Sequence, residues 1–361
     1  MTALPKHAWL AWCLLMLQPV AMAGPVSDLK SDETLVFFHT SAWLDKANNE
    51  WHIPIHGWVF EPADSSIRKA GIEQALKASH GLTVTAENTQ LFADRINALL
   101  ADNERGKQVV IRFADRSYAL PESAPNGHFH HTIKVKQAHL NAAGIRHQLQ
   151  FAAVLPDRDA RQFSGQAQLI SPQGLSIISD IDDTVKISAV TQRRELLQNT
   201  FYQPFKAVPG MAAHYRHWLA EDGALHFVSS SPWQLYPFLH EFIAQSGFPT
   251  ADYHLKSFRF KDSSLLNLWT KSTETKPPQI KAILQRYPQR QFILVGDSGE
   301  YDPEIYADIQ RQFPEQIKHI LIRNVTGERA SDERFQTAFK GLKPDQWQLF
   351  ETAAEITFKR P

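Results

Sequence analysis

The sequence has one cysteine, no net charge and few long apolar runs, and each scarcity excludes a class of protein. Its 361 residues contain a single cysteine, which excludes a disulfide framework and a zinc–thiolate site. Lys and Arg number 38, as do Asp and Glu, and this balance argues against nucleic acid, which favours strongly basic domains. Beyond the amino terminus no stretch approaches the roughly 20 apolar residues that cross a bilayer, so we expect no transmembrane helix in the mature chain.

The amino-terminal segment has the composition of a secretory signal peptide. Lys6 precedes an apolar run over residues 8–17, Pro19 ends the run, and residues 21–23 have the small-x-small pattern of a cleavage site. We therefore expect residues 1–23 to be removed and the chain to be exported, to the periplasm or the medium. An uncleaved membrane anchor is the alternative, although the run is short for a bilayer.

The mature chain changes its pattern near residue 165, which predicts a β-rich domain over residues 24–165 and an α/β domain over residues 166–361. In the first part, short alternating segments separated by turn residues favour a β-sandwich-like domain, with helices at residues 65–78 and 88–100 as an insertion. The expected strands are residues 35–44, 51–60, 81–86, 108–113, 128–135, 147–154 and 162–170.

In the second part, apolar runs of strand length alternate with amphipathic helices. This alternation predicts a parallel sheet that is covered on both faces and whose chemistry lies at the carboxyl ends of its strands. The expected strands are residues 175–179, 224–228, 291–295 and 319–325, and the expected helices are residues 210–220, 232–245, 277–285 and 303–312.

Carboxylates follow the first of these strands. Asp180 and Asp182 are two residues apart in extended chain, so both side chains point to one side, where their repulsion would be relieved by a divalent cation. A solvated acidic turn is the alternative. An EF-hand is excluded, because Val185 and Thr191 occupy the positions of its glycine and its last glutamate.

Three further groups of polar residues occupy strand ends or helix starts. Ser229 follows the second strand, where hydroxyls and free amides can hold an anion, although an ordinary helix start has the same composition. Lys276 precedes the predicted helix at residue 277, and a surface lysine is its alternative. Asp297 and Asp302 follow the strand at residues 291–295 and add oxygen ligands.

In this order, the four groups resemble the motifs of the haloacid dehalogenase superfamily of phosphotransferases. The chain further resembles the actin-patch-associated phosphatidate phosphatase family, which implies a Rossmann-like parallel sheet of haloacid dehalogenase type and Mg²⁺-dependent hydrolysis of phosphatidate to diacylglycerol. Two departures are the export signal and Ser230, where this family's second motif is expected to have Asn. The stretches that carry the closer resemblance are residues 57–62, 102–107, 178–186, 229–237 and 296–306.

The resemblance also implies roles for single residues. Asp180 would be the nucleophile that forms an aspartyl-phosphate, and Asp182 the general acid and base. Thr184 would orient Asp182, whereas Asp183 is explained only as an acidic residue at a helix N-terminus. The implied ligands of Mg²⁺ are Asp180, the backbone carbonyl of Asp182, Asp297 and Asp302, and the implied contacts of the phosphoryl oxygens are Ser229 and Lys276.

The spacing of the motifs bears on the substrate. Only 44 residues separate Thr184 from Ser229, and 46 separate Ser229 from Lys276, which leaves no room for a large cap domain. We therefore expect an open site, which suits a bulky or membrane-borne phosphoester. Residues 258–261 and 265–269 would form an interfacial rim for peripheral membrane contact, or else an ordinary core or hairpin.

Aromatic residues and histidines allow two further interpretations. Trp233, Tyr236 and Phe238 follow the second motif and would either touch acyl chains or pack their helix onto the sheet. His128, His130 and His131 fall in one predicted strand, with His128 and His130 on the same face. A zinc or copper site there is not favoured, because 16 histidines in one chain make such coincidences common.

Two other functions compete with a lipid phosphatase. The first is an exported phosphatase of the same chemistry that acts on soluble phosphomonoesters such as nucleotides. The second is a carbohydrate- or protein-binding module with a decayed enzyme domain, which is the weakest hypothesis because all four motifs retain reactive residues.

Overall fold

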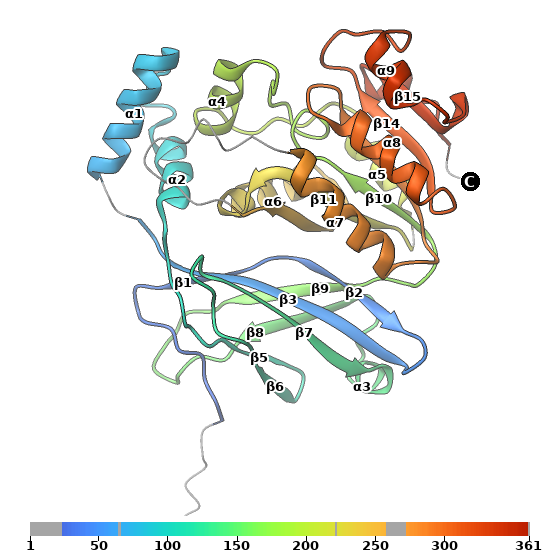
Figure 1. The fold of residues 1–361 in the computed structure, drawn as a ribbon. Helices are drawn as coiled ribbons and strands as arrows, with labels where there is room; N and C mark the ends of the chain where they lie inside the picture. Colours follow the sequence, from blue (N-terminus) through green and yellow to red (C-terminus); the bar gives the residue numbers. More distant parts are fainter. Residues whose placement is uncertain (1–23, 64–65, 221, 258–271, 360–361) are drawn as a thin grey trace, which may run out of the picture.

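The structure is a computed structural model, and it describes residues 24–63, 66–220, 222–257 and 272–359. Two β-sheets lie in separate layers, with helices around the carboxyl-terminal one (Figure 1). The predicted signal peptide, residues 1–23, lies outside the described residues. Among the residues that are described, no helix is both long and apolar enough to cross a membrane.

The first sheet has nine strands in the order β1-β3-β2-β9-β8-β5-β6, and both β4 and β7 also pair with β3. Its pairs are antiparallel except that of β2 with β9. Since all nine strands belong to one hydrogen-bonded sheet, the sandwich-like arrangement stays a prediction. The strands are β1 (Thr34–Phe37), β2 (Thr40–Asp45), β3 (Glu50–Glu61), β4 (Asp102–Asn103), β5 (Val110–Phe113), β6 (Arg116–Ala119), β7 (His128–Lys136), β8 (Gln148–Ala153) and β9 (Ser164–Leu169).

Several elements of this part differ from the prediction. The expected strand at residues 35–44 is split into β1 and β2, and strands β4 and β6 and helix α3 (Gln137–Ala142) were not predicted. Residues 81–86 form no strand. They connect α1 (Ser66–His80) to α2 (Thr89–Leu100), and Gly81 adopts φ +65°, the left-handed conformation that commonly ends a helix.

The second sheet is wholly parallel, in the order β12-β11-β10-β13-β14-β15. The chain moves outward from β10 to β12 and then returns to β13 on the other side of β10. In such sheets ligands bind outside the carboxyl ends of the strands at this switch point, here between β10 and β13. The strands are β10 (Leu175–Ser179), β11 (Ala224–Pro232), β12 (Ala251–Lys256), β13 (Gln291–Asp297), β14 (Ile317–Arg323) and β15 (Trp347–Phe350).

Helices cover both faces of this sheet, as predicted. Side chains of α5 and α6 join one apolar core, and those of α7, α8 and α9 join another. Edge strands β12 and β15 and helix α4 were not predicted, and α7 begins five residues earlier than expected, so that Lys276 lies inside it. The helices are α4 (Arg193–Phe201), α5 (Met211–Trp218), η1 (Trp233–Leu235), α6 (Tyr236–Gln245), α7 (Ser272–Arg286), α8 (Asp302–Gln312) and α9 (Glu333–Ala338).

Aromatic side chains join the two sheets. The ring of Phe38 lies 4.3 Å from that of Trp233 and 4.8 Å from that of Tyr236, and the His39 N–H donates to the Tyr236 hydroxyl at 3.0 Å. Trp233 and Tyr236 are buried in this junction. The packing interpretation of these two residues is therefore confirmed, although much of their packing is against the first sheet.

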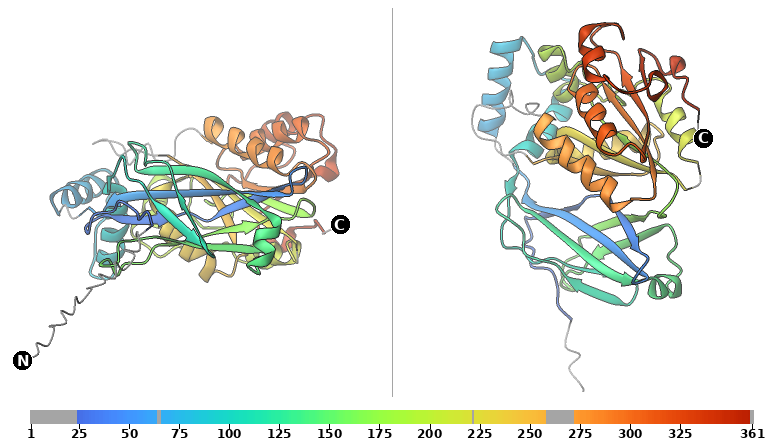
Figure 2. Two further views of the ribbon diagram at one scale, coloured as in Figure 1. Left: turned by 90° about the horizontal axis from the view of Figure 1, so that it is seen from below. Right: turned by 45° about the vertical axis from the view of Figure 1, so that its right-hand side comes forward.

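Helices α1 and α2 of the amino-terminal part lie beside the second sheet (Figures 1 and 2). Helix α2 contacts η1 and α4, which follow the carboxyl ends of β11 and β10. Its buried Arg95 donates to the carbonyls of Thr200 at 2.7 Å and Gln203 at 2.8 Å, and its guanidinium lies 3.7 Å from the centre of the Phe205 ring. The amino-terminal part thus flanks the edge at which the motifs meet.

Candidate active site

The residues predicted from the four motifs meet at the carboxyl ends of β10, β11 and β13. Asp180 directly follows β10, Asp297 ends β13 and Asp302 begins α8. Lys276 reaches this edge from α7, with its Nζ 3.1 Å from Oδ1 of Asp180 and 2.6 Å from Oδ1 of Asp302. Ser229 lies in the last part of β11, where its Oγ accepts the N–H of Ser231 at 3.2 Å. The predicted set is therefore one cluster in space.

Glu300 is a member of this cluster that the sequence analysis did not assign. Its Oε2 lies 3.0 Å from Nζ of Lys276 and accepts a 3.5 Å hydrogen bond from Oγ of Ser230. Its position in the sequence could have indicated this role, since Glu300 lies between two assigned aspartates in the same loop. Although burial disfavours the ammonium, Asp180, Asp302 and Glu300 raise the pKa of Lys276 well above its usual value.

Three carboxylates form the part of the cluster that suits a metal ion. One oxygen from each of Asp180, Asp297 and Asp302 lies within 4.8 Å of the others, and all three residues are at most 1% exposed. Oδ1 of Asp180 forms an ion pair with Lys276, whereas Oδ2 of Asp180 and Oδ2 of Asp297 are buried and accept no hydrogen bond from any described residue. Such unsatisfied buried oxygens fit a hard divalent cation.

The pKa values of these carboxyls reflect the crowding. Burial raises the pKa of Asp180 well above its usual value, and the carboxylates of Asp302 and Glu300 add to this against the attraction of Lys276. Burial, followed by Asp302 and Asp180, likewise raises the pKa of Asp297. One lysine therefore does not balance the negative charge gathered here, and a bound cation would do so.

The turn after β13 holds its carboxylates in fixed directions. Oδ1 of Asp297 accepts the N–H groups of Gly299 at 2.7 Å and Glu300 at 3.2 Å, which leaves Oδ2 directed elsewhere. Oδ2 of Asp302 accepts the N–H of Asp297 at 3.3 Å. A Cβ at Gly296 would lie 2.7 Å from Cβ of Asp302 and 2.7 Å from Cε2 of Tyr306, so only glycine allows this approach.

We expect Gly296→Ala to lower activity about a hundredfold, because displacing a catalytic group by about 1 Å costs roughly that factor. The added methyl group would push Asp302 away from Lys276. Steady-state kinetics measures the loss, and Gly71→Ala is the control, since nothing lies within 4 Å of a Cβ at Gly71. Near-normal activity of Gly296→Ala would contradict the assigned position of Asp302.

Asp182 has a different environment. Its Oδ1 lies 2.7 Å from Nζ of Lys186 and accepts the Ser188 hydroxyl at 2.6 Å, while its Oδ2 accepts the Ser231 hydroxyl at 2.7 Å. Burial alone would raise the pKa of this carboxyl, but Lys186 and the two serines lower it below its usual value. Asp180 and Asp182 thus have pKa values displaced in opposite directions, a pattern found where two carboxyls have different catalytic roles.

We expect Ser231→Ala to raise the pKa of Asp182, since one donor to its carboxylate is lost. A group with a higher pKa needs a higher pH to ionise, so any limb of the pH–rate profile that Asp182 controls should move to higher pH. Activity measured from acid to alkaline pH tests this, with Ser79→Ala on the exposed face of α1 as control. A pH–rate profile that is the same in Ser231→Ala and in the unchanged chain would contradict the assignment of one of its limbs to Asp182.

Thr184 was expected to orient Asp182 and to close the turn, and only the second part is seen: its N–H donates to the carbonyl of Ile181 at 3.3 Å, while its hydroxyl is buried without a hydrogen-bond partner among the described residues. The expectation for Asp183 is wrong. Asp183 does not begin a helix. It has φ +53°, and its carboxylate accepts the N–H groups of Ser188, Ala189 and Val190 at 2.6–2.9 Å. Asp183 therefore fixes the loop that places Ser188 against Asp182.

The described residues contain no large cap domain, and open access to the site stays a prediction. Between β10 and β11 these residues hold α4 and α5, and between β11 and β13 they hold η1, α6, β12 and α7, with no further globular unit in the described ranges. Asp180, Ser229, Lys276 and Asp297 are nevertheless at most 2% exposed. The predicted interfacial rim, residues 258–261 and 265–269, lies outside the described residues.

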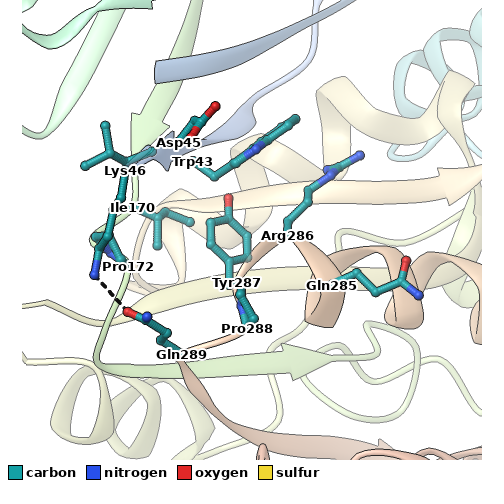
Figure 3. Close-up of a pocket in the computed structure, with 11 residues that line it drawn as sticks. Trp43, Asp45, Lys46, Ile170, Pro172, Gln285, Arg286, Tyr287, Pro288 and Gln289 are labelled. Atoms are coloured by element: carbon teal, nitrogen blue, oxygen red, sulfur yellow. Dashed lines mark hydrogen bonds between the residues drawn. The ribbon is translucent and has the colours of Figure 1, made fainter. Parts of the chain in front are cut away.

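A separate pocket of about 310 Å³ lies at the opposite edge of the second sheet (Figure 3). Its lining includes Ile170 and Pro172, which precede β10, and Gln289, which precedes β13 and accepts a hydrogen bond from Lys46 at 2.8 Å. The amino ends of the strands therefore border this pocket. It contains none of the predicted catalytic residues and is not part of the candidate active site.

The histidines of β7 divide between the two faces of the first sheet. His128 and His130 share one face as predicted, and there they meet His56 of β3, whose Nε2 lies 2.9 Å from Nδ1 of His128. His131 points to the opposite face, since alternate residues of a strand do so. The sequence offered no reason to add His56, which lies more than 70 residues earlier.

Comparison with known proteins finds similarity in the part of the chain that carries the predicted motifs. Residues 175–324 match the family model described as phosphatidate phosphatase APP1, catalytic domain. An uncharacterized protein of Schizosaccharomyces pombe is 30% identical over 207 residues, which are 56% of this chain and 34% of that protein. Phosphatidate phosphatase APP1 of Saccharomyces cerevisiae is 38% identical over 162 residues, 44% of this chain and 27% of that protein. The chain thus spans about a third or less of the length of these two relatives.

Proposed function

We propose that this chain hydrolyses phosphatidate to diacylglycerol and inorganic phosphate, because residues 175–324 match the family model of the phosphatidate phosphatase APP1 catalytic domain. The observation that carries the proposal is the carboxylate of Asp180. It lies at the switch point of the parallel sheet, with Oδ1 3.1 Å from Nζ of Lys276 and with no hydrogen bond from a described residue to Oδ2. We assign the sheet to the haloacid dehalogenase type without a large cap.

In the first step, an oxygen of Asp180 attacks phosphorus, the bond to the glycerol oxygen breaks, and an aspartyl-phosphate forms. Lys276 would neutralise negative charge on the phosphoryl oxygens, and Ser229 would donate a hydrogen bond to one of them. In the second step, a water molecule attacks phosphorus, the acyl-phosphate bond breaks, and the carboxylate is regenerated.

Asp182 would move the protons of both steps. The leaving alkoxide takes a proton from the Asp182 carboxyl, and the resulting carboxylate then takes one from the attacking water. Lys186, Ser188 and Ser231 favour the carboxylate, the form required for the second step. Asp182 must therefore gain its proton against their attraction before it can act as the acid.

The residues present fit Mg²⁺, which would be held by Asp180, Asp297, Asp302 and the backbone carbonyl of Asp182. When bound, Mg²⁺ supplies positive charge that lets a carboxylate approach a phosphate dianion. Asp297 and Asp302 would hold the ion in place through their fixed directions in the turn after β13.

Activity on phosphatidate in detergent micelles, compared with a panel of soluble phosphomonoesters, tests the proposed function. We expect phosphate release from phosphatidate that needs Mg²⁺ and disappears in excess EDTA. Asp297→Asn should weaken the activation of the enzyme by Mg²⁺ far more than His131→Gln does. Full activity in excess EDTA would contradict the metal assignment, and activity confined to nucleotides would favour the soluble-substrate alternative.

Two further parts of the proposal concern the rest of the chain. We assign residues 24–165 to an amino-terminal domain of unassigned role and residues 166–361 to the catalytic domain. Export to the periplasm or the medium, with loss of residues 1–23, rests on the signal-peptide pattern, and a mature chain that begins at Gly24 would support it.

A further inference from the structure

A second cluster of metal-binding side chains lies at the junction of the two sheets, apart from the catalytic carboxylates. His56, His128 and His130 each offer a ring nitrogen, and these three nitrogens lie within 4.8 Å of one another. The pairing of β3 with β7 places His56 directly opposite His130 and Trp58 opposite His128. The three imidazoles therefore occupy one face of the sheet in fixed register.

The surroundings of the cluster favour the neutral imidazole, which is the form that binds metals. His56 and His128 are each 6% exposed. The ring of His56 lies 4.4 Å from that of Phe38 and 4.5 Å from that of Trp233, and it stacks on that of His130 at 3.7 Å. These three neighbours are aromatic and carry no negative charge that would stabilise a protonated His56.

A pocket of about 320 Å³ adjoins the cluster. It is lined by His56 and His130 from the first sheet and by Asp252 and His254 from β12 of the second. Although burial opposes ionisation, His226 and His254 hold the pKa of Asp252 well below its usual value, so that an anion faces the histidines. Asp252 accepts a 2.8 Å hydrogen bond from Nδ1 of His226.

We propose that His56, His128 and His130 bind a divalent transition-metal ion of the Zn²⁺ class at the junction between the two sheets. Neutral nitrogen donors select such ions over Mg²⁺, which prefers oxygen. Closing the triangle of ring nitrogens by about 1 Å gives the ~2.1 Å bonds of zinc–imidazole coordination. His56 Nε2 and His128 Nδ1 now share one proton in a hydrogen bond. The nitrogen that carries this proton must release it to become a ligand, which requires a change of tautomer.

The hydrogen bond between His56 and His128 explains two of the three rings without a metal. It does not explain why His130 lies over His56. A bound cation accounts for this, because it takes a third nitrogen ligand. This site is independent of the proposed phosphatase activity, since it shares no residue with the catalytic cluster.

Zn²⁺ binding to the full chain in excess Mg²⁺, measured by competition with a chromophoric chelator, tests the proposal. Excess Mg²⁺ occupies the carboxylate site, so the experiment reports the histidines. We expect one Zn²⁺ per chain and binding at least about tenfold weaker in His130→Gln, since even the loss of an outer partner of a metal ligand costs that much. His130 is exposed, so this variant should fold.

His131→Gln is the matched control, because it changes the same strand on its opposite face. His131→Gln should bind Zn²⁺ as tightly as the unchanged chain does. Zn²⁺ should raise the melting temperatures of the unchanged chain and of His131→Gln, but not that of His130→Gln. No binding in excess Mg²⁺, equal binding by the two variants, or loss of binding in Asp297→Asn would each overturn the proposal.

Discussion

Replacing Asp180 by Asn should lower phosphate release by about a thousandfold or more, the loss typical of a removed nucleophile. The amide keeps the shape of the side chain but has no anionic oxygen to attack phosphorus. Neither Asp297 nor Asp302 can replace it, because the turn after β13 fixes both carboxylates through backbone N–H groups.

The stability of the same variant separates chemistry from misfolding. Burial and neighbouring carboxylates raise the pKa of Asp180, so its ionised form is disfavoured in the folded chain. The neutral Asn variant should therefore melt no lower than the unchanged chain in the absence of metal. Asp115→Asn, at a position with 78% side-chain exposure, is the control for activity. Retention of more than a tenth of the activity by Asp180→Asn would rule out Asp180 as the nucleophile.

Replacing Asp182 by Asn should affect substrates according to their leaving groups. An alkyl phosphate such as phosphatidate leaves as a strongly basic alkoxide and needs the proton, so its turnover should fall about a hundredfold to ten-thousandfold. An aryl phosphate leaves as a weak base and should still phosphorylate the enzyme at close to the normal rate. Its second step lacks a base for water and should be slow.

Rapid-mixing kinetics with an aryl phosphate distinguishes the two steps. In Asp182→Asn the phenol should appear in a burst of about one equivalent, followed by slow turnover. The conservative Ser188→Ala variant, which loses one donor to Asp182, should show a smaller change in the same direction. An equal loss for aryl and alkyl substrates would contradict the assignment of Asp182 to proton transfer.

Local patterns predicted the second sheet well because its central strands are apolar at nearly every position. Strand β10 is buried throughout, and such continuous runs between helices are typical of parallel sheets. The edge strands were not predicted because they are less apolar, as β12 (Ala251–Lys256) illustrates. The motif residues were predicted for a related reason, since each follows an apolar run of strand length or lies at the predicted start of a helix.

The partners of those residues could not be predicted, because they depend on contacts between distant segments. The sequence explains Asp183 only as an acidic residue at a helix N-terminus, whereas in the structure its carboxylate accepts three N–H groups of the loop at residues 188–190. His56 joins His128 only through the pairing of β3 with β7. Spacing along the chain also predicted an open site, and this stays a prediction, because the distances between motifs do not determine which elements surround the carboxylates.

The most direct test of a phosphatase that works through Asp180 is the mass of the Asp182→Asn chain after rapid mixing with an aryl phosphate in the presence of Mg²⁺. One added phosphoryl group per chain, located on Asp180 by peptide mapping, is the expected result. A chain that carries no phosphoryl group, or Asp180→Asn trapping phosphate where Asp182→Asn does not, would contradict the assigned roles of the two aspartates.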